Sequence, residues 1–128
     1  MRKIFTAFGF LILSTNYLGE AAEEPLILKV TPQTAIASFY QPTTIKIDIT
    51  VERHSDNRKY ILEIWDLEFE GGIPVRRSEN QINGEFAKKI IPSIYWEFYP
   101  GEYVIRVILI RIGNREIIKL QKITVAGS

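Results

Sequence analysis

The single histidine of the chain lies in the run His54-Ser55-Asp56, whose residue types match those of a serine-hydrolase triad. In such a triad each side chain must point at the next, because the histidine takes the proton of the serine and the aspartate orients the histidine. Neighbours in a tight turn point in different directions, and the following Asn57 and Arg58 are typical of a solvated turn. The sequence predicts a turn here and no catalytic residues.

The carboxylates Asp66, Glu68 and Glu70 alternate along the chain and are the other group with possible chemistry. A glycosidase needs two carboxyls across a sugar-sized cleft, and calcium needs several oxygens from one loop. A strand with its acidic face in solvent explains the spacing without either. The chain contains no cysteine, which excludes thiolate nucleophiles, cysteine zinc sites and disulfides. We therefore expect no metal, no cofactor and no enzymatic activity.

Four aromatic residues gather within five positions: Tyr95, Trp96, Phe98 and Tyr99. Large apolar side chains close the ends of a small core, so packing is the first interpretation. The alternative is a platform of Tyr95, Trp96 and Tyr99 that stacks on sugar rings, and it would be favoured if Trp96 and Tyr99 are both accessible and coplanar.

The elements that would position these residues are short runs with strand character, separated by turn residues, and no run has helical periodicity. A loop is expected from Ala35 to Gln41 and turns at Gly71-Gly72, Asn83-Gly84 and Gly113-Asn114. The expected strands are 26–30, 44–52, 60–69, 75–79, 85–91, 94–96, 103–110 and a last one that includes 118–125.

Strand parity predicts which side chains form the core. Between 44 and 52 the isoleucines alternate with polar residues, so one face is buried and the other is wet. In the last strand Ile118 and Leu120 have one parity and Ile123 and Val125 the other. A β-bulge near Gln121 or Lys122 would put all four on one side.

The run Pro100-Gly101-Glu102-Tyr103, the later Gly113-Asn114 and the ending Ile123-Thr124-Val125 resemble the closing hairpin of immunoglobulin-like and fibronectin type III-like domains of bacterial exported proteins. The resemblance implies an all-β, antiparallel two-sheet sandwich of about seven strands. It also implies that Tyr103 forms a structural corner, with its hydroxyl bonded to upstream backbone, and that Trp65 is a core residue. The cysteine pair of antibody-type domains is missing, so the resemblance extends only to the broader sandwich class.

A second interpretation places Trp65 outside the core. If Leu62 and Ile64 point inward, their neighbours on the same strand point outward, and the penultimate strand is apolar on both faces. The outward residues would form an apolar sheet face larger than an ordinary monomer exposes, which is typical of a docking surface. The candidate interaction surface consists of Ile61, Trp65, Leu67, Ile108, Ile110 and Ile118.

The N-terminus predicts export. Arg2 and Lys3 precede the apolar run 4–13, and Gly19-Glu20-Ala21 places small residues where a signal peptidase cleaves. We expect a signal peptide at 1–22 and a sandwich domain at 23–128, with the mature protein in the periplasm or secreted. The apolar run is shorter than the roughly 20 residues of a membrane span. Membrane contact is expected only in the alternative in which the segment stays as an anchor.

Without residues 1–22 the chain keeps 14 of its 16 basic and 14 of its 15 acidic residues, so its formal charge is zero. A domain with no basic surplus lacks the charge needed to bind a phosphate backbone, which argues against nucleic acid. The sequence thus predicts an exported, non-enzymatic sandwich domain with a structural or protein-binding role, through a protein partner or self-association. The alternative is a carbohydrate or cell-wall binding module.

Overall fold

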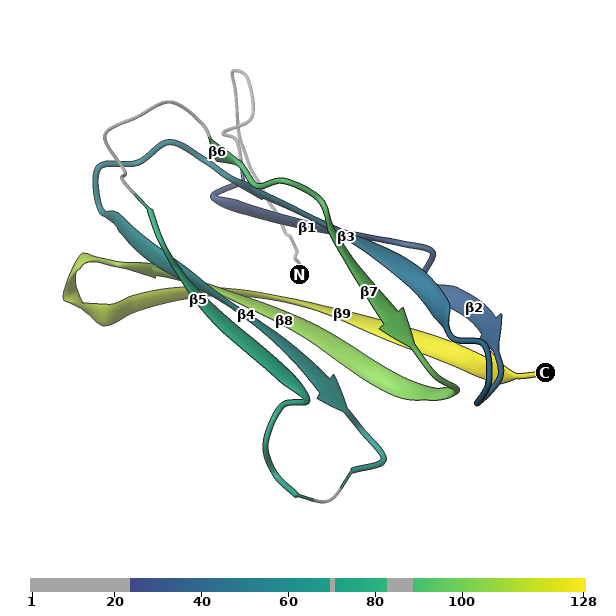
Figure 1. Ribbon diagram of the computed structural model, residues 1–128. Coiled ribbons are helices and arrows are strands. Elements are labelled where there is room, and N and C mark those ends of the chain that lie inside the picture. The colour runs from purple at the N-terminus through teal and green to yellow at the C-terminus, as the bar shows by residue number, and fades with distance from the viewer. Residues whose placement is uncertain (1–23, 70, 83–88) are drawn as a thin grey trace, which may run out of the picture.

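The computed structural model of the chain describes residues 24–69, 71–82 and 89–128 (Figure 1). These residues form two β-sheets that face each other, and the all-β, two-sheet architecture expected from the sequence is confirmed. The predicted signal peptide at 1–22 lies outside the described residues, as does the Asn83-Gly84 turn. The strands are β1 (Leu26–Thr31), β2 (Thr34–Ala37), β3 (Thr43–Val51), β4 (Asn57–Asp66), β5 (Arg76–Gln81), β6 (Lys89–Ile90), β7 (Ile94–Phe98), β8 (Gly101–Arg111) and β9 (Arg115–Gly127).

The four-stranded sheet is built around β3, which pairs with β1 on one side and with both β6 and β7 on the other. The five-stranded sheet has the order β2-β9-β8-β4-β5. All of these pairs are antiparallel except β2 with β9, which is parallel. Strands β1 and β2 are consecutive in the chain but belong to different sheets, so the chain crosses between the layers at 32–33.

The core lies between the sheets and follows the predicted parity. On β3 the alternate residues Ile45, Ile47, Ile49 and Val51 are buried, while the residues between them are partly or fully exposed. Strands β4 and β8 contribute inward side chains with the same period of two. Burying each such side chain stabilises the fold by about 1.5–3 kcal/mol. The inward residues of these two strands are Tyr60, Leu62, Ile64, Tyr103, Ile105, Val107 and Leu109.

The hairpin between β8 and β9 turns at the expected residues. Gly113 has φ 78° and Asn114 has φ 58°, two consecutive left-handed conformations within a short 3₁₀ segment, Ile112–Asn114. Glycine and asparagine adopt this region at low cost, which explains why the reversal occurs there.

Two expectations about the strands are wrong. The segment expected to be a loop from Ala35 to Gln41 begins with β2, because β9 continues to Gly127 and offers an edge on which Thr34–Ala37 pairs. The described residues also contain nine strands rather than about seven. The strand that the sequence did not predict is β2, which follows the crossing between sheets after β1, whereas β6 and β7 lie within or overlap the separately expected runs 85–91 and 94–96.

The expected β-bulge near Gln121 or Lys122 is also absent. The β8–β9 ladder runs from Gly101 opposite Val125 to Arg111 opposite Arg115 without a change of register. Ile123 and Val125 point into the core, and Ile118 and Leu120 point to the outer face instead of being shifted inward. The phase slip in the sequence therefore reflects a strand that is apolar on both faces at different points along its length.

Among the described residues, no helix has the length and apolar character needed to cross a membrane.

Candidate functional site

The outer side of the five-stranded sheet carries most of the candidate interaction surface. Ile61 of β4 lies opposite Ile108 of β8, which in turn lies opposite Ile118 of β9. All three have the parity opposite to the core residues of their strands, so they form one row across the outer face. Trp65 of β4 and Ile110 of β8 have the same outward parity as this row, whereas Leu67 lies in the turn after the end of β4, where it is exposed.

The exposure of this outer face is uneven. Ile61 and Ile108 are buried although they lie outside the core cluster, so neighbouring side chains of the same face cover them. Towards β9 the face opens, with Ile118 44% and Leu120 63% exposed. Leu120 was not among the predicted surface residues, although Ile118, two positions earlier on the same strand, was. Strict alternation from Ile123 back along β9 is the signal that would have found it. We use the term outer apolar face for Ile61, Trp65, Ile108, Ile110, Ile118 and Leu120.

Trp65 is partly buried and does not belong to the core. The core position implied by the immunoglobulin resemblance is wrong for this residue, because the core parity of β4 is taken by Tyr60, Leu62 and Ile64. Of the two interpretations of Trp65, the outward one is correct.

A buried carboxylate lies in the middle of the outer apolar face. Glu63 is buried, and its Oε1 accepts a hydrogen bond of 2.9 Å from the Trp65 indole Nε1. Two guanidinium groups approach from the neighbouring strands, with Arg106 Nε 3.3 Å and Arg77 Nε 3.6 Å from the Glu63 oxygens. The carboxylate fixes the orientation of the tryptophan, and its own charge is balanced by the two arginines.

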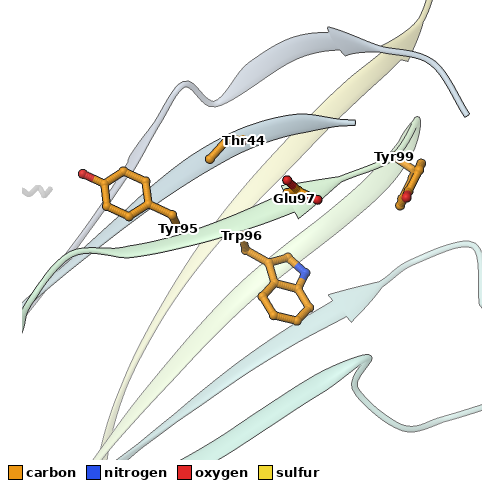
Figure 2. Close-up of a pocket in the computed structure, with 5 residues that line it drawn as sticks. All are labelled: Thr44, Tyr95, Trp96, Glu97 and Tyr99. Atoms are coloured by element: carbon orange, nitrogen blue, oxygen red, sulfur yellow. The ribbon is translucent and has the colours of Figure 1, made fainter. Parts of the chain in front are cut away.

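The aromatic residues near Tyr95 do not form one platform (Figure 2). Tyr95 and Trp96 are successive residues of β7 and point to opposite sides of it. Trp96 packs against the core, and the Arg76 guanidinium of β5 lies 4.4 Å from its ring centroid. Tyr95 and Tyr99 are 62% and 47% exposed. The inward position of Trp96 therefore leaves Tyr95 and Tyr99 as the exposed rings of this group.

Even so, a cavity of about 600 Å³ opens beside β7. Its lining comes mainly from this strand and the residue that follows it, and includes one charged group, the Glu97 carboxylate. The lining residues are Thr44, Tyr95, Trp96, Glu97 and Tyr99 (Figure 2).

Tyr103 occupies the corner between β7 and β8. Its hydroxyl donates a 2.8 Å hydrogen bond to the carbonyl of Tyr99, four residues upstream, and its ring meets Phe98 edge to face at 4.9 Å. Burial raises the pKa of the Tyr103 hydroxyl, and the charges of Asp66 and Glu68 add to this. The hydroxyl therefore remains a donor at neutral pH, and the corner is held by the neutral phenol.

The turn at His54 is built for structure. His54 Nδ1 accepts a 3.1 Å hydrogen bond from the backbone N–H of Asp56, whereas a triad histidine donates from this nitrogen to its aspartate. Asn57 is buried, which the interpretation of a solvated turn missed. Its Nδ2 donates to the Glu52 carbonyl at 2.8 Å, and its Oδ1 accepts from Arg111 Nε at 2.9 Å. The cue was available in part, since asparagine favours turns by bonding backbone groups.

The carboxylates that alternate after β4 take part in a turn. Asp66 Oδ1 accepts a hydrogen bond from the backbone N–H of Glu68 at 2.9 Å, which stabilises the turn after β4, and Glu70 lies outside the described residues. Within the described ranges no three acidic, histidine or cysteine side chains are placed to hold a metal ion.

The two candidate functional regions of the described residues are surfaces for contact, the outer apolar face and the cavity beside β7. The outer apolar face and the cavity beside β7 lie on different sheets, and each is made by strand residues of fixed register. Neither the models of known protein families nor the curated proteins contain a match to this chain.

Proposed function

We propose that this chain is an exported, non-enzymatic domain of the immunoglobulin-like sandwich class that acts in the bacterial envelope or outside the cell by binding another protein or a second copy of itself. The sandwich class is supported by the strand order, with β1 and β3 in one sheet and β9-β8-β4 in the other, and by the Tyr103 corner. Export is supported by the N-terminal sequence.

The observation that carries the binding role is the outer apolar face. A strand needs apolar residues on one face only to form a core, and β8 already buries Ile105, Val107 and Leu109 on its inner side. The isoleucines at 108 and 110 on its outer side contribute nothing to that core. Apolar residues that gather on a sheet face outside the core are typical of contact surfaces.

The size of the sheet is close to that of a specific contact. Strands β2, β9, β8, β4 and β5 have 4, 13, 11, 10 and 6 residues, 44 in all, and at about 4.8 Å spacing and about 3.3 Å per residue they span roughly 700 Å². A standard protein interface buries about 800 Å² on each partner. The charge of Glu63 is paired within the face with Arg77 and Arg106. A docking partner therefore does not meet an unpaired carboxylate there.

Carbohydrate binding is the alternative function. It would use Tyr95 and Tyr99, with the Glu97 carboxylate as a hydrogen-bond acceptor for sugar hydroxyls. The inward position of Trp96 weakens this alternative, because the largest aromatic face is directed at the core and Arg76. Retention of the purified chain on an insoluble polysaccharide, lost in a Tyr95→Ala/Tyr99→Ala variant, would favour it over protein binding.

A photo-crosslinking residue tests the proposed contact in cells that produce the chain. We expect crosslinked protein when the reactive residue replaces Leu120, and none when it replaces Ile27, which is 39% exposed on the outer side of β1 in the other sheet. The mass of the adduct distinguishes a second copy from another protein. Equal yields at both positions, or no adduct at Leu120, would contradict the proposal.

A further inference from the structure

Strands β5 and β7 each lie at an edge of one of the two sheets, and their residues differ in polarity. Strand β5 has the sequence RRSENQ, with three charged and no apolar residues, whereas β7 has IYWEF, with a single charged residue. Proteins commonly protect free edges with charges, prolines or bulges, because an exposed edge is a template for another strand. Edge β5 follows this rule and edge β7 does not.

The backbone of β7 has a vacant side. Among the residues that the structure describes, β7 forms its ladder only with β3, from Thr43 opposite Phe98 to Ile47 opposite Ile94. The ladder has no change of register along these five pairs. The strand is therefore held straight and extended by β3, while its other edge can bond the N–H and C=O groups of an added strand.

The side chains along this edge point to the chemistry of the occupant. Tyr95 and Glu97 share the outer face of β7, and Tyr99 follows two positions later, so the carboxylate lies between two exposed rings (Figure 2). Glu97 forms no ion pair with any other described residue. Lys46, which lies opposite Tyr95, pairs with Asp48 at 3.7 Å, and Arg76 lies 4.4 Å from the Trp96 ring centroid.

A carboxylate between two tyrosine rings attracts a cation from two directions. The ion pair acts through Glu97, and the electron-rich ring faces add a cation–π contribution. A lysine or arginine directly opposite Glu97 on an added strand would have its Cβ about 5 Å away, the spacing at which cross-strand pairs interact. The cavity of about 600 Å³ gives room for such a side chain.

We infer that the free edge of β7 binds an extended peptide as an additional strand, with a basic side chain of that peptide placed opposite Glu97 between Tyr95 and Tyr99. Main-chain hydrogen bonds would supply most of the affinity, and the acidic aromatic groove would select the residue. A second copy of β7 does not meet this requirement, because IYWEF contains no basic residue. This site is separate from the outer apolar face, so either can fail without the other.

The test uses the purified chain and an acetylated, amidated nine-residue probe of alternating threonine and valine with arginine at its centre. We expect the probe to slow amide hydrogen exchange in β7 and to shift the backbone NMR signals of 94–98. Replacing the central arginine by glutamate should weaken binding about tenfold, because attraction to Glu97 becomes repulsion. Methylating alternate backbone nitrogens of the probe should abolish binding, since the ladder hydrogen bonds are lost.

Two variants of the chain complete the experiment. Glu97→Gln should weaken binding of the probe about threefold to fivefold, the range expected for an exposed ion pair. Glu116→Gln is the matched control, because Glu116 is an exposed acidic residue of β9 in the other sheet, and it should leave binding unchanged. No binding of the probe, or equal binding after backbone methylation or in Glu97→Gln, overturns the inference. Displacement of the signals of 94–98 by an oligosaccharide in place of the probe would assign the groove to sugar and overturn it as well.

Discussion

The outer faces of the two sheets differ in chemistry although both belong to one sandwich. On β3, at the centre of the four-stranded sheet, the outward residues are Thr44, Lys46, Asp48 and Thr50, all polar. On β8, at the centre of the five-stranded sheet, they are Glu102, Val104, Arg106, Ile108 and Ile110, three of the five apolar. The core imposes the same demand on both strands, so the apolar outer residues of β8 have another cause. A contact surface is the cause that we propose.

The largest expected effect separates the inner and outer faces directly. Ile105 is fully buried in the core, and Ile105→Ala should lower the free energy of unfolding by about 2–5 kcal/mol. Ile118→Ala on the outer face should change it by about 0.5 kcal/mol or less, since the side chain is already half in water. Urea denaturation of both variants measures the difference. Similar losses in the two variants would mean that the assigned faces are wrong.

The turn that joins β3 to β4 should show the next largest effect. Asn57→Ala removes a buried side chain that bonds both the Glu52 carbonyl and Arg111. We expect a loss of about 2 kcal/mol, because the partly buried Arg111 also loses an acceptor. Thermal unfolding checks this, and Ser55→Ala in the same turn, at an exposed position, is the control. An unchanged melting temperature in Asn57→Ala would show that the turn is solvated, as the sequence suggested.

Carboxylates at the centres of the two outer faces provide a matched pair. Glu63→Gln leaves Arg106 without its anion, whereas Arg77 keeps Glu79 at 3.0 Å, and both arginine side chains are partly exposed, which limits the cost to about 1–2 kcal/mol. Asp48→Asn on the other face should cost about 0.5 kcal/mol or less, since its Lys46 pair is exposed. Denaturation at neutral pH compares them. Emission from Trp65 should also change in Glu63→Gln, because its indole then donates to a neutral amide oxygen in place of a charged carboxylate.

The corner residue should have a smaller effect. Tyr103→Phe keeps the ring on Phe98 and removes only the bond to the Tyr99 carbonyl, so we expect a loss of about 1 kcal/mol. Because the pKa of the Tyr103 hydroxyl is raised in the folded chain, its bond contributes below the ordinary pKa of 10.0 and is lost as the pH rises through the raised value. The difference between wild type and variant should therefore shrink at strongly alkaline pH. A constant difference would contradict this role of the hydroxyl.

The sequence predicts which face of a strand points to the core only when the other face is polar. The alternation on β3 is unambiguous because its outer residues are polar, and the same strand is found in the structure. Strands β4 and β8 are apolar on both faces, so period alone cannot orient Trp65, and the predicted bulge in β9 came from forcing Ile118 and Leu120 into the core. Strand β2 was missed because its pairing depends on the far end of β9, about 90 residues away in the chain.

In the candidate sites, positions set by strand parity could be predicted, whereas contacts set by side-chain conformation could not. Row partners such as Ile61, Ile108 and Ile118 could be proposed from parity, because antiparallel neighbours share a face. The contacts of Glu63 with Trp65 and of Arg76 with Trp96 join residues through side-chain conformation and across sheets, and no spacing in the sequence encodes them. Tyr95 and Trp96 were grouped by sequence, but adjacent strand residues point to opposite sides.

The smallest expected effect lies at the border of the outer apolar face. Lys59 and Arg77 hydrogen-bond Glu79 and lower the pKa of its carboxyl, Lys59 most strongly. The Glu79 carboxylate therefore stabilises the folded state at pH values above its ordinary pKa of 4.5, and this stabilisation is lost as the pH falls through the lower pKa of the folded state. Melting temperatures of wild type and Glu79→Gln should differ slightly at pH 6 and converge near pH 3. A difference in melting temperature that grew towards acidic pH would show that Lys59 and Arg77 do not stabilise the Glu79 carboxylate. The ion pairs at this border of the outer face would then not contribute to the stability of the fold.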